Sequence, residues 1–271
     1  MKIIRCFPFA VLVLFLICSA FFIKPDLNHD GKKKQILKIL CYNIHHASPP
    51  SKPDSIDLDA IARVIDAQDP DLVALQEVDV FTRRSGAFNQ AEELGKKTGL
   101  SPYFFKAIDF DGGEYGVAIL SRFPVLETNL YALPIRNGSG AEPRVLGTAS
   151  VELPSGKHIL FACTHLDSQR DSVNRHLQIT AIASILKASK DPIIIAGDFN
   201  AIPGSQVIRI LDNNFTRTCD PCDFTIPVDN PDKAIDFIAF TRNKFKVQMH
   251  EVIQESYASD HLPVFSVLEV R

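Results

Sequence analysis

Ten short apolar runs between residues 36 and 271 constrain the fold of this chain more than any other feature of its sequence. They contain many β-branched and other apolar residues, and turn-forming or polar residues bound them. Runs of this length and composition are typical of β-strands. The predicted strands cover residues 36–43, 71–77, 115–121, 125–133, 146–153, 158–164, 192–197, 235–240, 245–252 and 263–270.

Four other stretches place apolar residues three and four positions apart, which is the pattern of an amphipathic helix. The predicted helices cover residues 55–68, 89–99, 172–189 and 205–213. In the first of them, Asp57 lies near the start, where its side chain can cap the helix. No repeat or linker divides residues 36–271. The whole pattern therefore predicts two packed sheets covered by helices.

The first 35 residues differ in character from the rest. Residues 1–23 have a basic start and an uncharged apolar middle, as in a secretory signal, with small residues that allow cleavage after Ala20. An uncleaved membrane anchor and a lipid attached to Cys18 are open alternatives. Residues 24–35 read as a polar tether, and the folded domain spans 36–271. We therefore expect an exported protein that is periplasmic, extracellular or held at the membrane by its N-terminus.

The charge of the mature chain argues against broad nucleic-acid binding. Without residues 1–20, 27 lysines and arginines face 32 acidic residues, a net charge of −5. Sequence-independent binding of nucleic acid depends on a basic surface. The chain also contains no tryptophan. A nucleic-acid substrate is thus disfavoured, although a local basic groove would permit one.

The cysteines outside the leader fall into two pairs. Cys41 and Cys163 lie in apolar strand patterns, which predicts simple core packing. Cys219 and Cys222 form a C-x-x-C pair, which fits either a small-loop disulfide or free thiols. Zinc is disfavoured because no second pair of cysteines follows.

Polar residues of chemical interest recur at the ends of the predicted strands. The most hydrophobic strand, with isoleucines at 193–195, leads directly to Asp198, and a buried anion is costly unless it is paired or holds a metal. Binding and catalytic residues are often found on loops that converge at one edge of packed sheets. The recurring residues are Asn43, Glu77, His165, Asp198, Asn200, Asp260 and His261.

Seven motifs then resemble one known family. In chain order they are YNIHH, LVALQEVD, YGVAILSRFPV, THLD, AGDFNAIP, AIDFI and SDHLPV. Together they resemble the endonuclease/exonuclease/phosphatase family over residues 36–271. The resemblance implies an α+β fold, a four-layer αββα sandwich of two mixed, mostly antiparallel sheets flanked by helices. It also implies hydrolysis of a phosphoester that depends on Mg²⁺ or Mn²⁺.

The resemblance assigns expected roles to individual residues. The metal ligands would be Glu77, Asn43 and Asp260, because hard cations prefer oxygen ligands. Asp198 would orient or deprotonate the attacking water, and Asn200 would donate to a phosphoryl oxygen. The expected catalytic residues are His165, Asp198, Asn200, Asp236 and His261, with Asp236 fixing the tautomer of His261.

Further residues are expected to contact the substrate. These are Arg144, in a polar loop, together with His45 and Tyr115. Arg122 fits a structural salt bridge better than a substrate contact. His45 stands where abasic-site endonucleases carry an aspartate. The CTHLD motif also departs from their tyrosine-containing motif, so the chain resembles the deoxyribonuclease and sphingomyelinase branch.

The combined expectation is an exported, monomeric, metal-dependent phosphohydrolase that acts on a phosphodiester. The alternatives are a nuclease on DNA or RNA, a sphingomyelinase-like hydrolase of lipid head groups, and a hydrolase of small sugar phosphates or nucleotides. A hypothesis of another class is a non-catalytic phosphate-binding module. That hypothesis predicts losses among the polar positions, and all of them are present.

Overall fold

The computed structural model describes residues 34–271. The predicted leader, and all but the last two residues of the tether, therefore lie outside the described residues. Within residues 34–271, none of the helices combines the length and apolar character that crossing a membrane requires.

The first of two six-stranded sheets contains both the first and the last strand of the domain. Its spatial order is β11 (Phe245–Val252), β12 (Val264–Val270), β1 (Ile36–Asn43), β2 (Leu72–Val80), β4 (Gly113–Ser121) and β3 (Ser101–Phe110). β1 and β2 are parallel, and the other neighbours are antiparallel.

The second sheet follows the same plan. Its spatial order is β5 (Val125–Ala132), β6 (Val145–Glu152), β7 (His158–His165), β8 (Ile193–Asp198), β10 (Asp236–Phe240) and β9 (Thr216–Arg217). Only β7 and β8 run parallel among these neighbours. Two mixed, mostly antiparallel sheets are thus confirmed.

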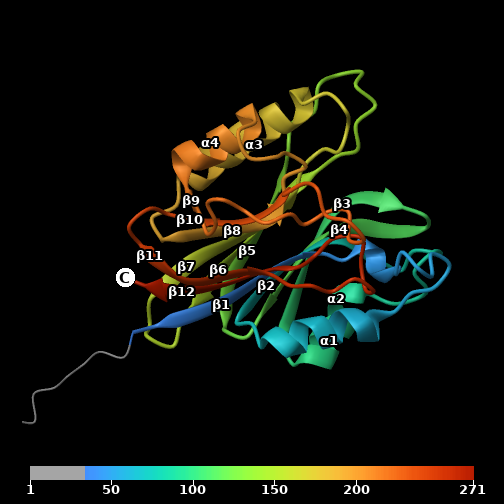
Figure 1. Ribbon diagram of the computed structural model, residues 1–271, viewed down its shortest axis with the longest axis horizontal. Helices are drawn as coiled ribbons and strands as arrows, with labels where there is room; N and C mark the ends of the chain where they lie inside the picture. Colours follow the sequence, from blue (N-terminus) through green and yellow to red (C-terminus); the bar gives the residue numbers. More distant parts are fainter. Residues whose placement is uncertain (1–33) are drawn as a thin grey trace, which may run out of the picture. The chain divides into compact units, whose positions relative to one another are not determined.

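Helices cover the outer face of each sheet, as Figure 1 shows with α3 and α4 on one side and α1 and α2 on the other. Their bounds are α1 Leu58–Gln68, α2 Gln90–Thr98, α3 Val173–Leu186 and α4 Gln206–Asn214. All four predicted helices are confirmed. The Asp57 side chain caps α1 by accepting a hydrogen bond from the Ala60 N–H at 2.9 Å.

The main core lies between the two sheets, where apolar side chains of both inner faces pack together. Ile39, Phe161 and Ile194 are completely buried there. Burying such a side chain contributes about 1.5–3 kcal/mol, so this layer contributes strongly to the stability of the domain. Cys41 and Cys163 belong to the same core, which confirms that they pack as small apolar residues.

Two other predictions concern pairs of residues. Cys219 and Cys222 form a disulfide, the first of the two alternatives for this pair. Arg122 bonds to Asp69 at 2.6 Å and lies 3.4 Å from Asp71, which confirms that it makes a structural salt bridge.

The sequence pattern did not predict β3 or β9. β3 is an edge strand of its sheet, and most of its side chains are only partly buried. Its apolar residues are therefore interrupted by polar ones such as Lys106 and Asp109. β9 has two residues, which is too short for any periodicity to show.

Gly197 allows β8 to lie close to β7. A Cβ atom at this position would lie 2.2 Å from the Thr164 carbonyl oxygen. Gly197→Ala must therefore push the two strands apart, and we expect the free energy of unfolding in urea to fall by about 1–3 kcal/mol. Because His165 and Asp198 end these strands, activity should fall as well.

Gly156→Ala serves as the comparison, because Gly156 lies in the turn at the other end of β7 with no atom within 4 Å of the added Cβ. Its φ of 75° makes the alanine cost about 1–2 kcal/mol, but activity should be retained. Wild-type activity in Gly197→Ala would show that the close approach is not needed.

Candidate active site

Three neighbouring strands of the second sheet bring three polar residues side by side. His165 ends β7, Asp198 ends β8 and Asp236 begins β10. The register pairs Asp198 with His165 on one side and with Asp236 on the other. All three residues are buried. Residues far apart in the sequence therefore form one continuous polar row at the edge of the sheet.

Asn43 joins this row to the first sheet. It ends β1, and its Nδ2 donates to Glu77 Oε1 at 3.2 Å and to Asp198 Oδ2 at 3.2 Å. One amide thus bridges carboxylates from both sheets. The Asn43 carbonyl oxygen in turn accepts a hydrogen bond from Ser259 Oγ at 2.7 Å, which ties β1 to the loop before β12.

Glu77 has an unusual backbone conformation. Its φ is 59°, and the pairing of β2 with β4 shifts register between Leu75 and Val78. A bulge of this kind re-aims a side chain, and strained residues of this kind cluster at functional sites. Burial opposes the charged form, but the His46 imidazole and the Asn43 amide hold the pKa of Glu77 well below its usual value.

His261 is held by an acidic partner. Its Nδ1 lies 2.9 Å from Asp236 Oδ2, which also accepts a hydrogen bond from Thr225 Oγ1 at 2.6 Å. Since a carboxylate only accepts, Nδ1 carries a proton and Nε2 faces Asp198 Oδ2 at 3.9 Å. Burial alone would lower the pKa of His261, but the charges of Asp236 and Asp198 raise it to about 10. His261 is therefore an imidazolium.

His165 has the opposite character. Arg144 Nη1 lies 3.1 Å from His165 Nδ1. Because a guanidinium only donates, Nδ1 must accept, and the ring proton resides on Nε2, which lies 3.4 Å from Asp198 Oδ2. Burial and the positive charge of Arg144 lower the pKa of His165 well below its usual value. The site therefore combines a neutral and a charged imidazole on either side of one carboxylate.

Asp198 lies at the centre of the row. Its Oδ1 accepts from the Asn200 backbone N–H at 2.8 Å, and its Oδ2 faces Asn43, His165 and His261. Burial and the charge of Asp236 raise the pKa of Asp198. Asn200 has a φ of 47°, and its Nδ2 donates to the Leu166 carbonyl at 3.0 Å. The other N–H of the Asn200 side-chain amide can donate to a further acceptor.

His45 and His46 follow Asn43 in a short turn, η1 (His45–Ala47), whose three residues all have positive φ. The ligand atoms of His45, His46 and Glu77 lie within 4.8 Å of one another. His45 Nδ1 donates to the Ser48 carbonyl at 2.9 Å, which leaves Nε2 with a free lone pair. His46 is thus closer to the site than the sequence indicated.

The residues fit a divalent cation. Glu77 is a partly buried carboxylate that accepts from the Asn43 amide and lies 3.9 Å from His46, and a cation would offset its negative charge. Its oxygen atoms suit Mg²⁺ or Mn²⁺. A second group with ligand atoms within 4.8 Å consists of Asp198, Asp236 and His261. Asp260 bonds to Ser259 at 3.4 Å, and within residues 34–271 no hydrogen bond or ion pair joins it to Glu77 or Asn43.

Two of the residues expected to contact the substrate, Arg144 and Tyr115, are buried. Arg144 is buried against His165 and lies 3.3 Å from Glu142 Oε1. Tyr115 is also buried, beside Glu77 in a small cavity. Direct contact of Arg144, Tyr115 or His45 with a substrate stays a prediction.

Sequence reasoning missed several supporting residues. Thr225 and Ser259 were missed because a lone hydroxyl carries no signal in a single sequence. Arg84 and Glu142 also border Glu77; Arg84 lies in the turn just after β2, and Glu142 lies in a loop distant along the chain. Glu142 could have been proposed from the sequence, because it lies two residues before Arg144, which was already a candidate.

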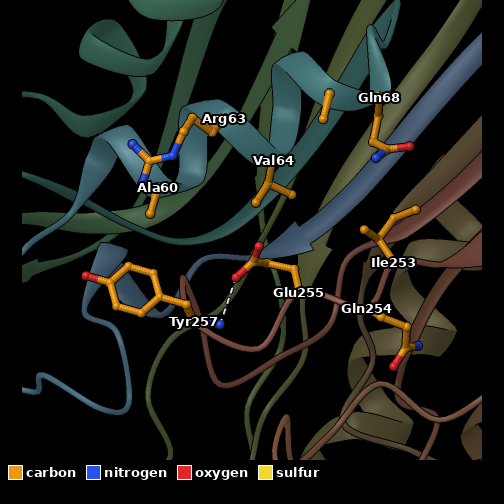
Figure 2. A pocket seen from close by; sticks show the side chains of 9 residues that line it. Ala60, Arg63, Val64, Gln68, Ile253, Gln254, Glu255 and Tyr257 are labelled. Atoms are coloured by element: carbon orange, nitrogen blue, oxygen red, sulfur yellow. Dashed lines mark hydrogen bonds between the residues drawn. The ribbon is translucent and has the colours of Figure 1, made fainter.

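A larger cavity, of about 360 Å³, lies between α1 and the segment 253–257. Figure 2 shows Arg63, Glu255 and Tyr257 around it, with Glu255 accepting a hydrogen bond from the Tyr257 N–H. None of the polar residues that converge around Asp198 lines this cavity. Size alone therefore does not locate the active site, and the convergent polar groups do.

Comparisons with known proteins agree with this architecture. An endonuclease/exonuclease/phosphatase from Beutenbergia cavernae DSM 12333 is 24% identical with a TM-score of 0.77, over 87% of this chain and 72% of that chain. A protein of that family from Bacteroides thetaiotaomicron is 20% identical with a TM-score of 0.74, over 88% and 99%. A mannosyl-6-phosphatase from Bacteroides thetaiotaomicron VPI-5482 is 19% identical with a TM-score of 0.70, over 86% and 99%.

These likenesses show a shared fold. The family description matches most of the chain, from residue 40 to residue 261, and so includes the row of polar strand ends from Asn43 to His261. The chain therefore belongs to the endonuclease/exonuclease/phosphatase family, whose members are phosphoester hydrolases.

Proposed function

We propose that this protein hydrolyses a phosphoester by in-line attack of water, with the help of Mg²⁺ or Mn²⁺. The observation that carries the proposal is the convergence of Asn43, Glu77, His165, Asp198, Asp236 and His261 from both sheets on one edge. Paired imidazoles, carboxylates and an amide within hydrogen-bond reach are the groups that phosphoryl transfer needs.

Glu77 and Asn43 would hold the cation, with Asp260 as a further candidate. When bound, a divalent cation neutralises charge on the phosphoryl oxygens and polarises the phosphorus. His45, through its free Nε2, is a candidate for an additional ligand, because a ligating histidine usually donates its other ring N–H to a carbonyl or carboxylate.

Asp198 would receive the proton of the attacking water. Its raised pKa makes it a better base than an ordinary aspartate, and His165 Nε2–H would help to orient it. The water oxygen bonds to phosphorus while the bond to the leaving alcohol breaks. The His261 imidazolium stabilises the charge and supplies a proton to the leaving oxygen. Asp236 keeps that proton-bearing ring in place.

The substrate class is also part of the proposal. We retain a phosphodiester as the leading expectation, and export through the N-terminus as the expected location. One similar structure is named as a mannosyl-6-phosphatase, so monoesters must be tested on equal terms. A nuclease and a sphingomyelinase-like hydrolase are alternative outcomes of the same test.

Metal removal tests the proposal directly. The purified protein should hydrolyse bis-(p-nitrophenyl) phosphate or p-nitrophenyl phosphate with Mg²⁺ or Mn²⁺, and EDTA should abolish the reaction. Adding back the cation should restore hydrolysis, because EDTA removes the cation from the carboxylates reversibly. Turnover that EDTA leaves unchanged would contradict the metal-dependent reaction. Failure to hydrolyse any phosphoester would contradict the proposed function.

A further inference from the structure

Two consecutive histidines of the short turn η1 lie beside Glu77 of β2. One ring nitrogen of His45, one of His46 and a carboxylate oxygen of Glu77 lie within 4.8 Å of one another. The two imidazole rings are tilted by 60° with their centres 4.5 Å apart, so both lie at the same place. The fold therefore brings two nitrogen atoms and one carboxylate into a group small enough to surround a single ion.

His46 contributes a buried nitrogen atom without a partner. Its Nδ1 makes no hydrogen bond within residues 34–271, and Glu77 Oε2 lies 3.9 Å away. That separation exceeds the roughly 2.7–3.2 Å of an N–H···O hydrogen bond. Two ligands of one small cation each lie about 2.0–2.2 Å from it, so the ligand atoms are about 3–4.4 Å apart. The spacing therefore fits a nitrogen and an oxygen that share a cation better than it fits a direct ion pair.

His45 is held in the orientation that a ligating histidine needs. Its Nδ1 donates to the Ser48 carbonyl at 2.9 Å, so Nε2 is the nitrogen with a free lone pair. Histidines that bind metals usually donate their other ring N–H in this way, which fixes the tautomer and the direction of the ring. The His45 backbone N–H also donates to Asn43 Oδ1 at 3.1 Å. His45 is therefore oriented before any ion binds.

The backbone that carries the two rings is strained and firmly held. The three residues of η1 have φ values of 46°, 44° and 60°, a region that few residues other than glycine adopt. The buried Gln90 side chain anchors this turn, because its Nε2 donates to the His46 carbonyl at 2.7 Å while its Oε1 accepts from the Asp79 N–H at 2.9 Å. One amide thus joins η1 to β2 two residues after Glu77. Strain that the surrounding structure maintains is typical of functional sites.

Glu77 presents its two oxygens to different neighbours. Oε1 accepts from Asn43 Nδ2 at 3.2 Å, and Oε2 is the oxygen that faces His46. Within residues 34–271, His46 is the one basic side chain at ion-pair distance from Glu77. The Glu77 side chain is 22% exposed and that of His46 is 15% exposed, so an ion can reach both from solvent. A cation at Oε2 would therefore meet a carboxylate that no lysine or arginine neutralises.

The kinds of ligand atom decide which cation fits such a group. Mg²⁺ binds through oxygen ligands and keeps several of its waters. Two imidazole nitrogens and one carboxylate are instead the ligand set of many catalytic zinc sites and of non-haem iron(II) sites. The affinity of sites with nitrogen and oxygen ligands also rises along the first transition row from Mn²⁺ to Zn²⁺. The pair of histidines therefore favours a transition metal ion over Mg²⁺.

We propose that His45, His46 and Glu77 form a cation site that binds a first-row transition metal ion, with affinity decreasing in the order Zn²⁺, Mn²⁺, Mg²⁺. The ligands are His45 through Nε2, His46 through Nδ1 and Glu77 through Oε2. Oxygen ligands alone, such as those of Asn43 and Asp260, would give a weaker preference. The use of the bound ion in hydrolysis rests on the proposed phosphoesterase function, but its binding does not.

Metal binding can be measured without a substrate. The purified full chain is freed of metal with EDTA, desalted and titrated calorimetrically with Zn²⁺, Mn²⁺ and Mg²⁺. We expect the Kd for Mn²⁺ to be at least about tenfold lower than that for Mg²⁺, and the Kd for Zn²⁺ to be lower still.

Variants connect this preference to the two rings. His45→Asn and His46→Asn remove an imidazole but keep a residue that tolerates positive φ. The affinity for Mn²⁺ should fall at least about tenfold in each, because loss of even an outer partner of a ligand costs about 10- to 100-fold. His158→Asn is the matched control, because His158 is exposed at the opposite end of β7 from His165. It should retain the wild-type Kd within about twofold.

Pulsed electron paramagnetic resonance identifies the ligands directly. The spin echo of Mn²⁺ bound to the wild-type protein should be modulated by coordinated imidazole nitrogen. The modulation should weaken in His45→Asn and in His46→Asn, and it should persist in His158→Asn. Thermal unfolding followed by circular dichroism shows whether each variant folds. The wild-type spectrum tests the site without any variant.

The outcomes separate this inference from the proposed function. A wild-type spectrum without nitrogen coupling would overturn the inference, and so would coupling and affinity that neither His45→Asn nor His46→Asn changes, because other ligands would then hold the ion. Affinity for Mg²⁺ equal to that for Mn²⁺ would also overturn it. Metal-dependent hydrolysis is compatible with all three results and would leave the proposed function standing. Nitrogen-coordinated Mn²⁺ in a protein that hydrolyses no phosphoester would instead support the site and remove the proposed function.

Discussion

Replacing Asp198 with asparagine is expected to lower kcat by about 10²- to 10⁴-fold, the range for loss of a positioned acid or base. Asp198 Oδ2 faces Asn43 at 3.2 Å, His165 at 3.4 Å and His261 at 3.9 Å. An amide has the same shape but cannot take up the proton of water. Its NH₂ group must also face some of the donors from which the carboxylate accepts hydrogen bonds, and those bonds are lost.

Steady-state kinetics on p-nitrophenyl esters would measure this loss, with thermal unfolding monitored by circular dichroism to show that the variant folds. Asp191→Asn provides a matched control. Asp191 lies just before the opposite end of the same strand, and it should retain wild-type kcat within about twofold. If Asp198→Asn retained kcat within tenfold, Asp198 would not be the group that accepts the proton.

Glu77→Gln is expected to weaken binding of Mn²⁺ and to lower kcat/KM at least about 100-fold, because a bound cation contributes several kcal/mol of transition-state stabilisation. The change keeps the shape of the side chain and the contact of Oε1 with Asn43. It removes the negative charge that would hold the cation. The loss should be largest at limiting metal concentration.

Two measurements would separate metal binding from catalysis. Calorimetric titration with Mn²⁺ reports affinity without turnover, and the electron paramagnetic resonance signal of free Mn²⁺ reports how much ion stays unbound. Glu93→Gln is the control, because Glu93 is a partly exposed residue of α2 whose ion pair within residues 34–271 is with Lys96. Wild-type affinity for Mn²⁺ in Glu77→Gln would show that other residues hold the cation.

The sequence was a good guide to the elements and to the chemistry of their ends. Strands such as β8 were predicted within one residue, because a run of isoleucines bounded by proline and aspartate has few other interpretations. The edge strand β3 was not predicted, because its side chains are partly exposed and polar residues interrupt the apolar pattern. The residues grouped around Asp198 were all proposed from the sequence, and the resemblance also paired Asp236 with His261, but their other contacts were not foreseen.

Arg144 shows that the sequence does not predict which partner a loop residue meets. Arg144 lies in a polar loop, and the sequence therefore suggested a substrate contact. The structure buries it and directs Nη1 to His165 Nδ1 at 3.1 Å. That contact decides which nitrogen of His165 carries the proton. A loop residue gives no local signal for the partner that it meets across the fold.

The sequence by itself determined the helices, all the strands except β3 and β9, and the polar residues at strand ends, because side-chain periodicity and turn chemistry are local properties. Only the tertiary structure decided how these residues face one another. Both faces of the first sheet are covered at β2, so this strand is buried almost throughout and its sequence shows no alternation to indicate where Glu77 points. A bulge directs Glu77 to Asn43, and cross-strand register aligns His165, Asp198 and Asp236. Register and bulges depend on the packing of the whole domain, and so does the site.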